Sequence, residues 1–320
     1  MTSVLDAQAL STIMGRRVTS VSVIDADPGN VYFRNGEAGL LDCRGSTRSG
    51  RTDRSGDRRC TETVHAVVDS LIMRMTVLGS GGWIPTSARQ TSCYLVTSGT
   101  EALVLDAGTG FGALHIDASL LDGVETVILA LSHFHLDHVT GLGFVTARAL
   151  GGRELTIAGP GSMAYGRPTR SIVEDQLLAS PFQTTSPLVS ARWAELGWDT
   201  LSFAGHEIQT WEQTRHPLPS AGFRVGDRLA YCTDTEFDPE TIRQVAGVTT
   251  LLHEAWEPTH PERGHTSGVE VGTIAVEAGV SRLLITHNHP LPGVPECTAA
   301  AAQTRFGNAV SARDGDILEL

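Results

Sequence analysis

Three histidines and an aspartate stand within six residues, and this run limits what the chain can fold into more than any other feature: His133-Phe134-His135-Leu136-Asp137-His138. It follows the apolar segment Val127–Leu131, which predicts a buried strand, and it precedes Gly141. Imidazole and carboxylate groups are costly to hold this close together unless a cation compensates, and they are the usual ligands of divalent metals. The run therefore predicts a metal site at the end of a strand.

The spacing within the run suits two metals better than one. In an extended segment His133 and His135 point to the same side and can bind one metal through neutral imidazole nitrogens. If the chain then turns, Asp137 and His138 reach a second metal. Two metals about 3.5–4 Å apart can share a bridging hydroxide, lower its pKa towards neutrality and bind the leaving oxygen. The alternative, ordinary surface histidines at a strand end, needs a chance cluster of a rare residue, so we expect a metallohydrolase.

Composition narrows the class of protein and of partner. A length of 320 residues allows one large domain or two smaller ones. No apolar stretch approaches 18 residues and the amino terminus lacks a secretory signal pattern, so we expect a soluble, cytoplasmic protein without a membrane partner. Five scattered cysteines without a CxxC pair predict reduced thiols. A net charge of −12 disfavours long nucleic acid and favours a small-molecule substrate.

The first 72 residues differ in kind from the rest. Arg44–Arg59 is rich in arginine, glycine and serine and has no apolar period, which predicts disorder because such a segment buries too little surface to offset its ordering entropy. Short elements are predicted nearby, namely strands at Val18–Ile24 and Val31–Phe33 and a helix at Val64–Met73. We expect residues 1–72 to be an extension outside the catalytic domain, which then spans 73–320. The alternative is an N-terminal tail or partner-binding arm.

From Met75 onward, short apolar runs alternate with helical patterns. Strands are predicted from Met75 to the glycines at 79–82 and at Ser92–Val96, Ala102–Asp106, Val124–Leu131, Glu154–Ala158, His206–Gln213, Ala221–Val225, Arg228–Thr233, Thr250–His253, Arg282–Thr286 and Ile317–Leu320. Helices are predicted at Gly141–Leu150, Arg170–Leu178, Pro239–Ala246, Ser267–Ala278 and Pro295–Phe306. Strand-rich halves with interspersed helices indicate an α/β fold with two sheets packed face to face and helices outside. The loops at the sheet ends then carry the chemistry.

A six-residue run cannot fill two coordination spheres, and three more candidates stand where predicted strands end. They are His216, Asp234 and His287. Each taken alone could equally be a helix-capping aspartate or a solvent-facing histidine. Their order and their strand contexts favour the metal site.

These segments resemble the metallo-β-lactamase superfamily, within it the branch of the tRNA 3′-processing endonuclease (RNase Z) and small cyclic phosphodiesterases. The resemblance runs from Met75 to Leu320 and rests on Asp106-Ala-Gly-Thr-Gly, Ser132-His-Phe-His-Leu-Asp-His-Val-Thr-Gly-Leu, His216 before Gly222-Phe-Arg, Thr233-Asp-Thr, His253-Glu-Ala, Gly264-His-Thr-Ser and Thr286-His. The His-x-His-x-Asp-His run is specific for the superfamily, and the His-Glu-Ala and His-Thr-Ser segments point to the branch. The resemblance implies the four-layer αββα sandwich.

It also implies roles for single residues. One zinc is held by His133, His135 and His216, the other by Asp137, His138 and His287, and Asp234 bridges both; manganese or iron is the alternative metal. Asp137 also orients the nucleophilic water or accepts its proton. His265 corresponds to the branch's extra histidine, which stabilises developing charge or protonates the leaving oxygen, with Glu254 as its orienting partner. Asp106 supports a ligand histidine, whereas His289, His260, His206 and His115 match no motif position.

The sequence departs from RNase Z in one respect. In some members of that family a long arm that grips tRNA lies between the counterparts of His216 and Asp234, but here only 17 residues separate them and a hairpin is predicted there. Together with the acidic charge this argues against tRNA processing. An arm within residues 160–205 stays open.

The function expected from these features is hydrolysis of a small or cyclic phosphodiester, such as a cyclic nucleotide or a sugar cyclic phosphate, by metal-bound hydroxide. The alternative is a metal-dependent ester, thioester, lactone or lactam hydrolase, and the His265–Glu254 pair favours the phosphodiester. A third class, a di-iron redox protein or a metal-binding module without turnover, is disfavoured by the intact ligand set. Trp83 and Trp256 either line the pocket or belong to the core. The resemblance also implies that a homodimer is one expected assembly.

Overall fold

The computed structural model describes residues 23–27, 30–34, 40–42, 72–143, 150–179 and 191–320, and the chain divides into two units, Met1–Ser70 and Leu71–Leu320. In the first unit β1 (Val23–Asp27), β2 (Asn30–Arg34) and β3 (Leu40–Asp42) form an antiparallel sheet. The strand predicted at Val31–Phe33 lies in β2, and the one at Val18–Ile24 meets β1 only at its last two residues. The predicted disorder of Arg44–Arg59 and most of the predicted helix Val64–Met73 lie outside the described residues, and the separate status of residues 1–72 stays a prediction.

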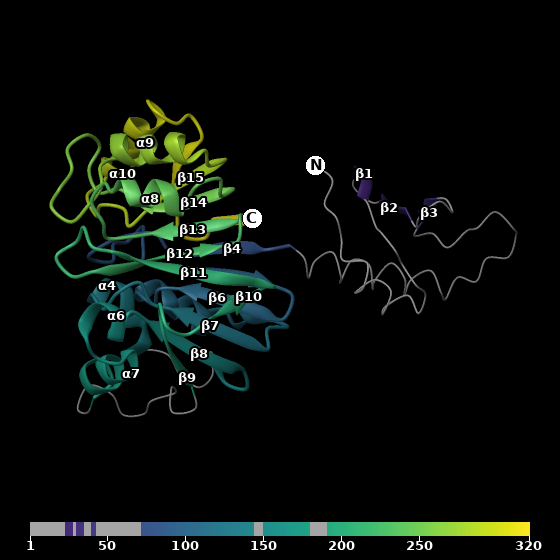
Figure 1. The fold of residues 1–320 in the computed structure, drawn as a ribbon, viewed down its shortest axis with the longest axis horizontal. Coiled ribbons are helices and arrows are strands. Elements are labelled where there is room, and N and C mark those ends of the chain that lie inside the picture. Colours follow the sequence, from purple (N-terminus) through teal and green to yellow (C-terminus); the bar gives the residue numbers. More distant parts are fainter. Residues whose placement is uncertain (1–22, 28–29, 35–39, 43–71, 144–149, 180–190) are drawn as a thin grey trace, which may run out of the picture. The chain divides into compact units, whose positions relative to one another are not determined.

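The second unit contains two seven-stranded sheets (Figure 1). One has the order β17-β4-β5-β6-β7-β8-β9, made by Ile317–Glu319, Arg74–Gly79, Cys93–Ser98, Glu101–Leu105, Thr126–Ala130, Glu154–Gly159 and Arg192–Glu195. The other has the order β10-β11-β12-β13-β14-β15-β16, made by Ser202–Phe203, His206–Gln213, Ser220–Val225, Leu229–Cys232, Thr250–Glu254, Arg282–Thr286 and Ala309–Ser311. Each sheet is mixed, with parallel pairs from β6 to β9 and from β13 to β16.

Alternation of side chains along the central strands builds three apolar layers. On β6, Leu103 and Leu105 belong to the core between the sheets, whereas Ala102 and Val104 face the opposite side. Both faces are thus buried, which is why these strands read as continuous apolar runs rather than alternating ones. The outer cores are closed by helices, so the layers are helix, sheet, sheet, helix. The predicted four-layer α/β sandwich is confirmed.

Helices cover the outer face of each sheet. On the β14–β15 side they are α8 (Pro239–Gln244), α9 (Gly268–Ala278) and α10 (Val294–Gln303), seen beside these strands in Figure 1. The other sheet is covered by short helices, among them η1 (Thr109–Gly112), α3 (Ala113–Ile116), η2 (Ala118–Leu121), α4 (Leu136–Val139), η3 (Thr140–Gly143), α6 (Gly161–Tyr165), α7 (Thr169–Ile172) and the π-helical turn η4 (Val173–Leu177). None of the described helices has the length and apolar character to cross a membrane.

Some predicted elements need correction. The helix predicted at Gly141–Leu150 is wrong at its start, where Gly141 lies in the 3₁₀ turn η3; residues 144–149 lie outside the description. A Cβ on Gly141 would lie 2.3 Å from the Gly108 carbonyl oxygen, so close packing rather than helix formation explains this glycine. Cys93, Cys232 and Cys297 are free thiols, as predicted; Cys43 and Cys60 lie outside the description.

Candidate metal centre

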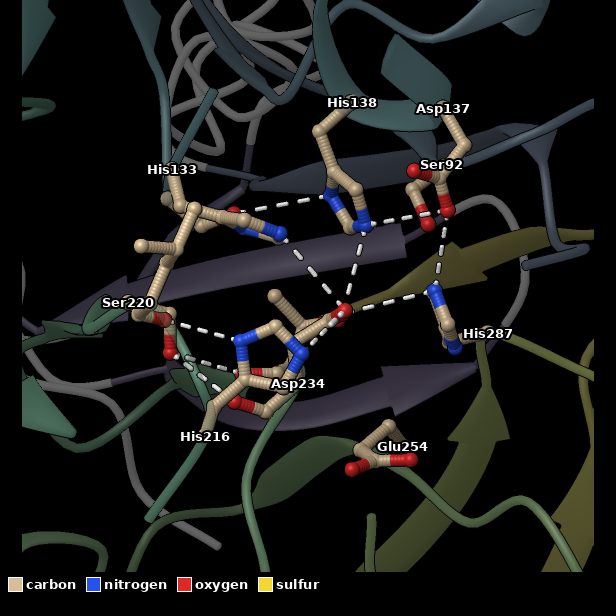
Figure 2. A network of polar contacts seen from close by, with 12 residues as sticks. Ser92, His133, Asp137, His138, His216, Ser220, Asp234, Glu254 and His287 are labelled. Carbon is tan, nitrogen blue, oxygen red and sulfur yellow. Dashed lines mark hydrogen bonds and ion pairs between the residues drawn. The ribbon is translucent and has the colours of Figure 1, made fainter. Parts of the chain in front are cut away.

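The histidine run leaves the carboxyl end of β7 as predicted. β7 ends at Ala130, and His135, which precedes the first turn of α4, has an extended backbone with φ −65° and ψ 148°. The rings of His133 and His135 meet edge to face, with centroids 4.6 Å apart. The turn of α4 then carries Asp137 and His138 to the neighbouring position (Figure 2). Because the backbone changes from extended to helical, one short segment directs His133 and His135 to one group and Asp137 and His138 to the other.

The three distant candidates also stand at strand ends. His216 follows β11, Asp234 follows β13 and His287 follows β15. Asp234 and His287 both have φ 48°, in the left-handed region that residues other than glycine seldom adopt. Such strain occurs where surrounding structure fixes a functional side chain.

All seven predicted ligands come together in two adjoining groups. Their donor atoms lie within 4.8 Å of one another in each group, which are His133, His135, His216 and Asp234 on one side and Asp137, His138 and His287 on the other. Asp234 lies between the groups (Figure 2). Its Oδ2 is 3.5 Å from His133 Nε2 and 3.6 Å from His216 Nε2, and its Oδ1 is 3.2 Å from His138 Nε2 and 3.4 Å from His287 Nε2. One carboxylate oxygen therefore faces each group, as a bridging ligand requires.

These residues fit a pair of divalent ions. The Nε2 atoms of His133 and His138 are buried and have no hydrogen-bond partner among the described residues, although buried polar atoms are normally satisfied. Burial and the neighbouring His138 hold the pKa of His133 well below its usual value, so this imidazole is neutral, the form that binds a metal. A set of imidazoles and carboxylates suits zinc, manganese or iron.

The two carboxylates in the groups are ionised. Burial alone raises the pKa of Asp234, but its electrostatic interactions with the surrounding imidazoles, chiefly those of His287 and His138, outweigh burial and hold that pKa well below the usual range. The pKa of Asp137 is lowered in the same way against its burial, by the charge of His138 and by contacts with His138 and His287. Asp137 Oδ2 also accepts a hydrogen bond of 2.7 Å from the Trp83 backbone N–H.

Asp106 supports the predicted ligand His138 through a hydrogen bond. Its Oδ2 accepts from His138 Nδ1 at 2.8 Å and from the Tyr231 hydroxyl at 2.7 Å, and the backbone N–H of Ser132 donates to its Oδ1 at 2.7 Å. All four residues are buried. This fixes the ring of His138 with Nε2 towards the cluster. The supporting position of Asp106 was predicted, whereas Tyr231, from a strand 125 positions away, carries no local signal in the sequence.

The predicted pair His265 and Glu254 lies next to the two groups. His265 Nδ1 is 3.2 Å from Glu254 Oε2, and Glu254 Oε1 also accepts from the Thr235 and Thr266 backbone N–H groups at 2.9 and 3.2 Å. Burial alone lowers the pKa of His265, but the charge and hydrogen bond of Glu254 outweigh it and raise the pKa to about 9. The ring of Trp256 stacks on this imidazole, with centroids 5.2 Å apart. Glu254 and Trp256 therefore fix the ring of His265, and the raised pKa favours its protonated form.

A cavity of about 380 Å³ opens onto these side chains. It is lined by five of the predicted ligands and by His265, Trp83, Trp256, Glu262, Arg263 and His289. His289 was left unassigned by the sequence patterns; its ring lies 4.5 Å from that of Trp256. His115, His206 and His260 are not among the described residues that line the cavity.

An α/β sandwich whose strand ends gather a histidine–aspartate centre beside a protonated histidine defines a metal-dependent hydrolase. The chain belongs to the β-lactamase superfamily, because residues 102–288 match the family model described as "Beta-lactamase superfamily domain". The resemblance stated from the motifs is thus confirmed, and so is the predicted class of enzyme.

Individual relatives agree with this family. The chain is 28% identical over 260 residues to the "Probable metallo-hydrolase YhfI" of Bacillus subtilis, covering 77% of this chain and 100% of the relative. It is 27% identical over 267 residues to "Ribonuclease Z" of Bacteroides fragilis, covering 66% and 87%. The crystal structure of YhfI superposes with a TM-score of 0.62 at 25% identity, covering 78% of this chain and 100% of that one. A diphosphatase from the PhnP family shares the fold, with a TM-score of 0.59 at 19% identity and coverage of 78% and 97%.

Proposed function

We propose that the protein is a dinuclear, zinc-dependent phosphodiesterase that acts on a small or cyclic phosphodiester. The observation that carries this proposal is the pair His265–Glu254, which places a protonated imidazole at the cavity beside two groups of metal ligands. Among the described residues that line the cavity, Arg263 is the one arginine, and its side chain makes no hydrogen bond or ion pair with the described residues. Two positive groups outside the metal ligands match the negative charge of a phosphodiester.

Different residues orient the attacking water and protonate the leaving group in this proposal. The two groups of histidines and aspartates would hold divalent ions, which would supply an activated water and neutralise charge on the phosphate oxygens. The ionised Asp137, held by the Trp83 N–H at 2.7 Å and in contact with His287 Nε2 at 3.1 Å, orients the attacking water. Glu254 occupies Nδ1 of His265, which leaves Nε2 for the substrate. His265 is protonated at neutral pH and donates that proton to the leaving alkoxide.

The cavity supports a small substrate. A volume of about 380 Å³ lies at the lower end of the range for small-molecule sites, about 300–1,000 Å³. The net charge of −12 disfavours a long polyanion. We therefore favour a small phosphodiester over tRNA as the substrate. The cytoplasmic location and the homodimer stay predictions.

Metal analysis followed by a turnover panel tests this function. Purified protein is assayed for zinc, manganese and iron, then with bis(p-nitrophenyl) phosphate, 2′,3′- and 3′,5′-cyclic nucleotides, and ester and lactam chromogens. We expect two zinc ions per chain and turnover of phosphodiesters. An Asp234→Ala variant is the control for contaminating hydrolases, because it removes the residue between both groups. Lactam or ester turnover without phosphodiester cleavage contradicts the proposal.

A further inference from the structure

Trp83 lines the cavity yet leaves its indole largely in solvent. Its side chain is 66% exposed, whereas Trp256, the other tryptophan of the cavity, is 7% exposed and packs against histidine rings. A large aromatic side chain is normally mostly buried. One that stays exposed beside a cavity can contact a bound ligand.

The backbone of Trp83, by contrast, is fixed. Its φ is 63°, a conformation that favours glycine, and its N–H donates to Asp137 Oδ2 at 2.7 Å. The neighbouring Gly82 N–H donates to the Asn288 carbonyl at 3.0 Å, and the Ile84 N–H donates to the Gly82 carbonyl at 2.8 Å. A bulky residue in a strained conformation beside a metal ligand indicates a use for its side chain.

Gly82, which precedes Trp83, lets the loop pass close to His287. A Cβ on Gly82 would lie 2.4 Å from the His287 imidazole, so the loop passes directly against a predicted ligand. Trp83 is therefore anchored between Asp137 and His287, next to the place where the phosphate reacts in the proposed function. A group bonded to that phosphate can reach the indole.

We propose that Trp83 is a specificity-determining residue, whose indole face stacks on a planar aromatic ring carried by the phosphate substrate, a nucleobase or an aryl group. This inference rests on the proposed function in one respect, namely that the substrate carries a phosphate group. Stacking on tryptophan accepts any ring with a π-face, and it favours an aromatic phosphodiester over a sugar phosphate of the same charge. The backbone of the same residue holds Asp137, so one residue places both the ring and the carboxylate.

A matched ligand pair tests the inference without turnover. Adenosine 5′-monophosphate and ribose 5-phosphate share the charged group and differ in the base, and their affinities for zinc-loaded protein are measured by calorimetry. We expect adenosine 5′-monophosphate to bind about tenfold more tightly, a ratio equivalent to about 1.4 kcal/mol. Trp83→Gly removes the ring and accepts the positive φ, so we expect this preference to disappear.

Further variants separate stacking from structure. Trp83→Phe keeps a ring and should retain most of the preference, and Trp83→Asn, which tolerates the left-handed conformation, should lose it as glycine does. Trp198→Ala is the matched control, because Trp198 is 70% exposed and is not among the described residues lining the cavity. Zinc content and thermal unfolding of each variant show that the site is intact.

The outcomes distinguish this inference from the proposed function. Equal binding of the two ligands by the unaltered protein, or a preference that survives in both Trp83→Gly and Trp83→Asn, overturns the role of Trp83. Hydrolysis of phosphodiesters without any preference for a ring overturns it too but leaves the proposed function standing. A ring preference that depends on Trp83, in a protein that cleaves no phosphodiester, supports the aromatic subsite and overturns the phosphodiesterase.

Discussion

At the scale of single residues, His265 shows how a buried carboxylate changes an imidazole. Glu254 is fully buried and contacts Nδ1 at 3.2 Å, so protonation of His265 gives Glu254 a partner for its charge. In chelator-treated protein we expect the His265 ring to titrate near pH 9, hence to be charged below that pH. Glu254→Gln should lower this pKa, since the desolvation remains and the charge is gone. A nitrogen NMR titration measures both; a wild-type pKa at or below 6.5 contradicts the assignment.

The same residue predicts a kinetic effect. His265→Ala should lower kcat for a phosphodiester by about 10²- to 10⁴-fold, the usual contribution of a general acid. An acid acts only while protonated, so wild-type activity should fall as pH rises through the His265 pKa in the loaded enzyme, and the variant should lack this alkaline limb. His260→Ala is the control, because His260 is exposed and not among the described residues lining the cavity. Full activity of His265→Ala would remove its role.

Some residues of the centre could be predicted from the sequence, and others could not. His133 to His138 form a local run, and His216, Asp234 and His287 follow predictable strands, so their meeting could be expected from strand ends at one edge. Trp83 and Tyr231 could not be assigned roles in this way. Their contributions depend on a backbone angle and on a contact across 125 positions, neither of which leaves a pattern in neighbouring residues.

At the scale of elements, the contact between β13 and the loop after β6 supports the centre. Tyr231 in β13 donates to the buried Asp106 carboxylate, which in turn holds His138. Tyr231→Phe should therefore lower the free energy of unfolding by about 1.5–3 kcal/mol, the range for a hydrogen bond to a charged group. Urea unfolding in the presence of chelator measures this loss apart from any loss of metal.

A second tyrosine provides the matched control for that experiment. The Tyr165 hydroxyl donates to the neutral Pro219 carbonyl at 3.0 Å and is only partly buried. Tyr165→Phe should cost about 0.5–1.5 kcal/mol. Equal losses for the two variants would mean that the charge of Asp106 adds nothing to the bond.

Elements were predictable where apolar periodicity or capping was strong. The predicted strands at His206–Gln213 and Arg282–Thr286 agree with β11 and β15, and Ser267 caps α9 with Glu270 in a reciprocal pair of hydrogen bonds. The missed strands β9, β10 and β16 have four residues or fewer and depend on a neighbouring strand for their conformation. Such short segments carry too few residues for a period to be seen.

At the scale of the whole second unit, the candidate centre joins the two sheets. His133, His135, Asp137 and His138 follow β7 of one sheet, whereas His216, Asp234 and His287 follow strands of the other. A pair of ions held by both sets would therefore connect the two sheets of the sandwich. A ligand that binds only the folded state stabilises that state. Removing the ions should therefore lower the free energy of unfolding.

We therefore expect chelation to lower the thermal midpoint and restored zinc to raise it again. With free zinc at about 100 times its dissociation constant, linkage gives about 2.7 kcal/mol of stabilisation for one site. Calorimetric scans at several zinc concentrations measure this effect. In Asp234→Ala the midpoint should respond much less to zinc, since both groups lose a predicted ligand. Asp122→Ala should respond as the wild type does, because Asp122 is exposed and is not among the described residues that line the cavity. Zinc that raised the midpoint of wild type and Asp234→Ala equally would bind elsewhere, and the seven residues would not be its site.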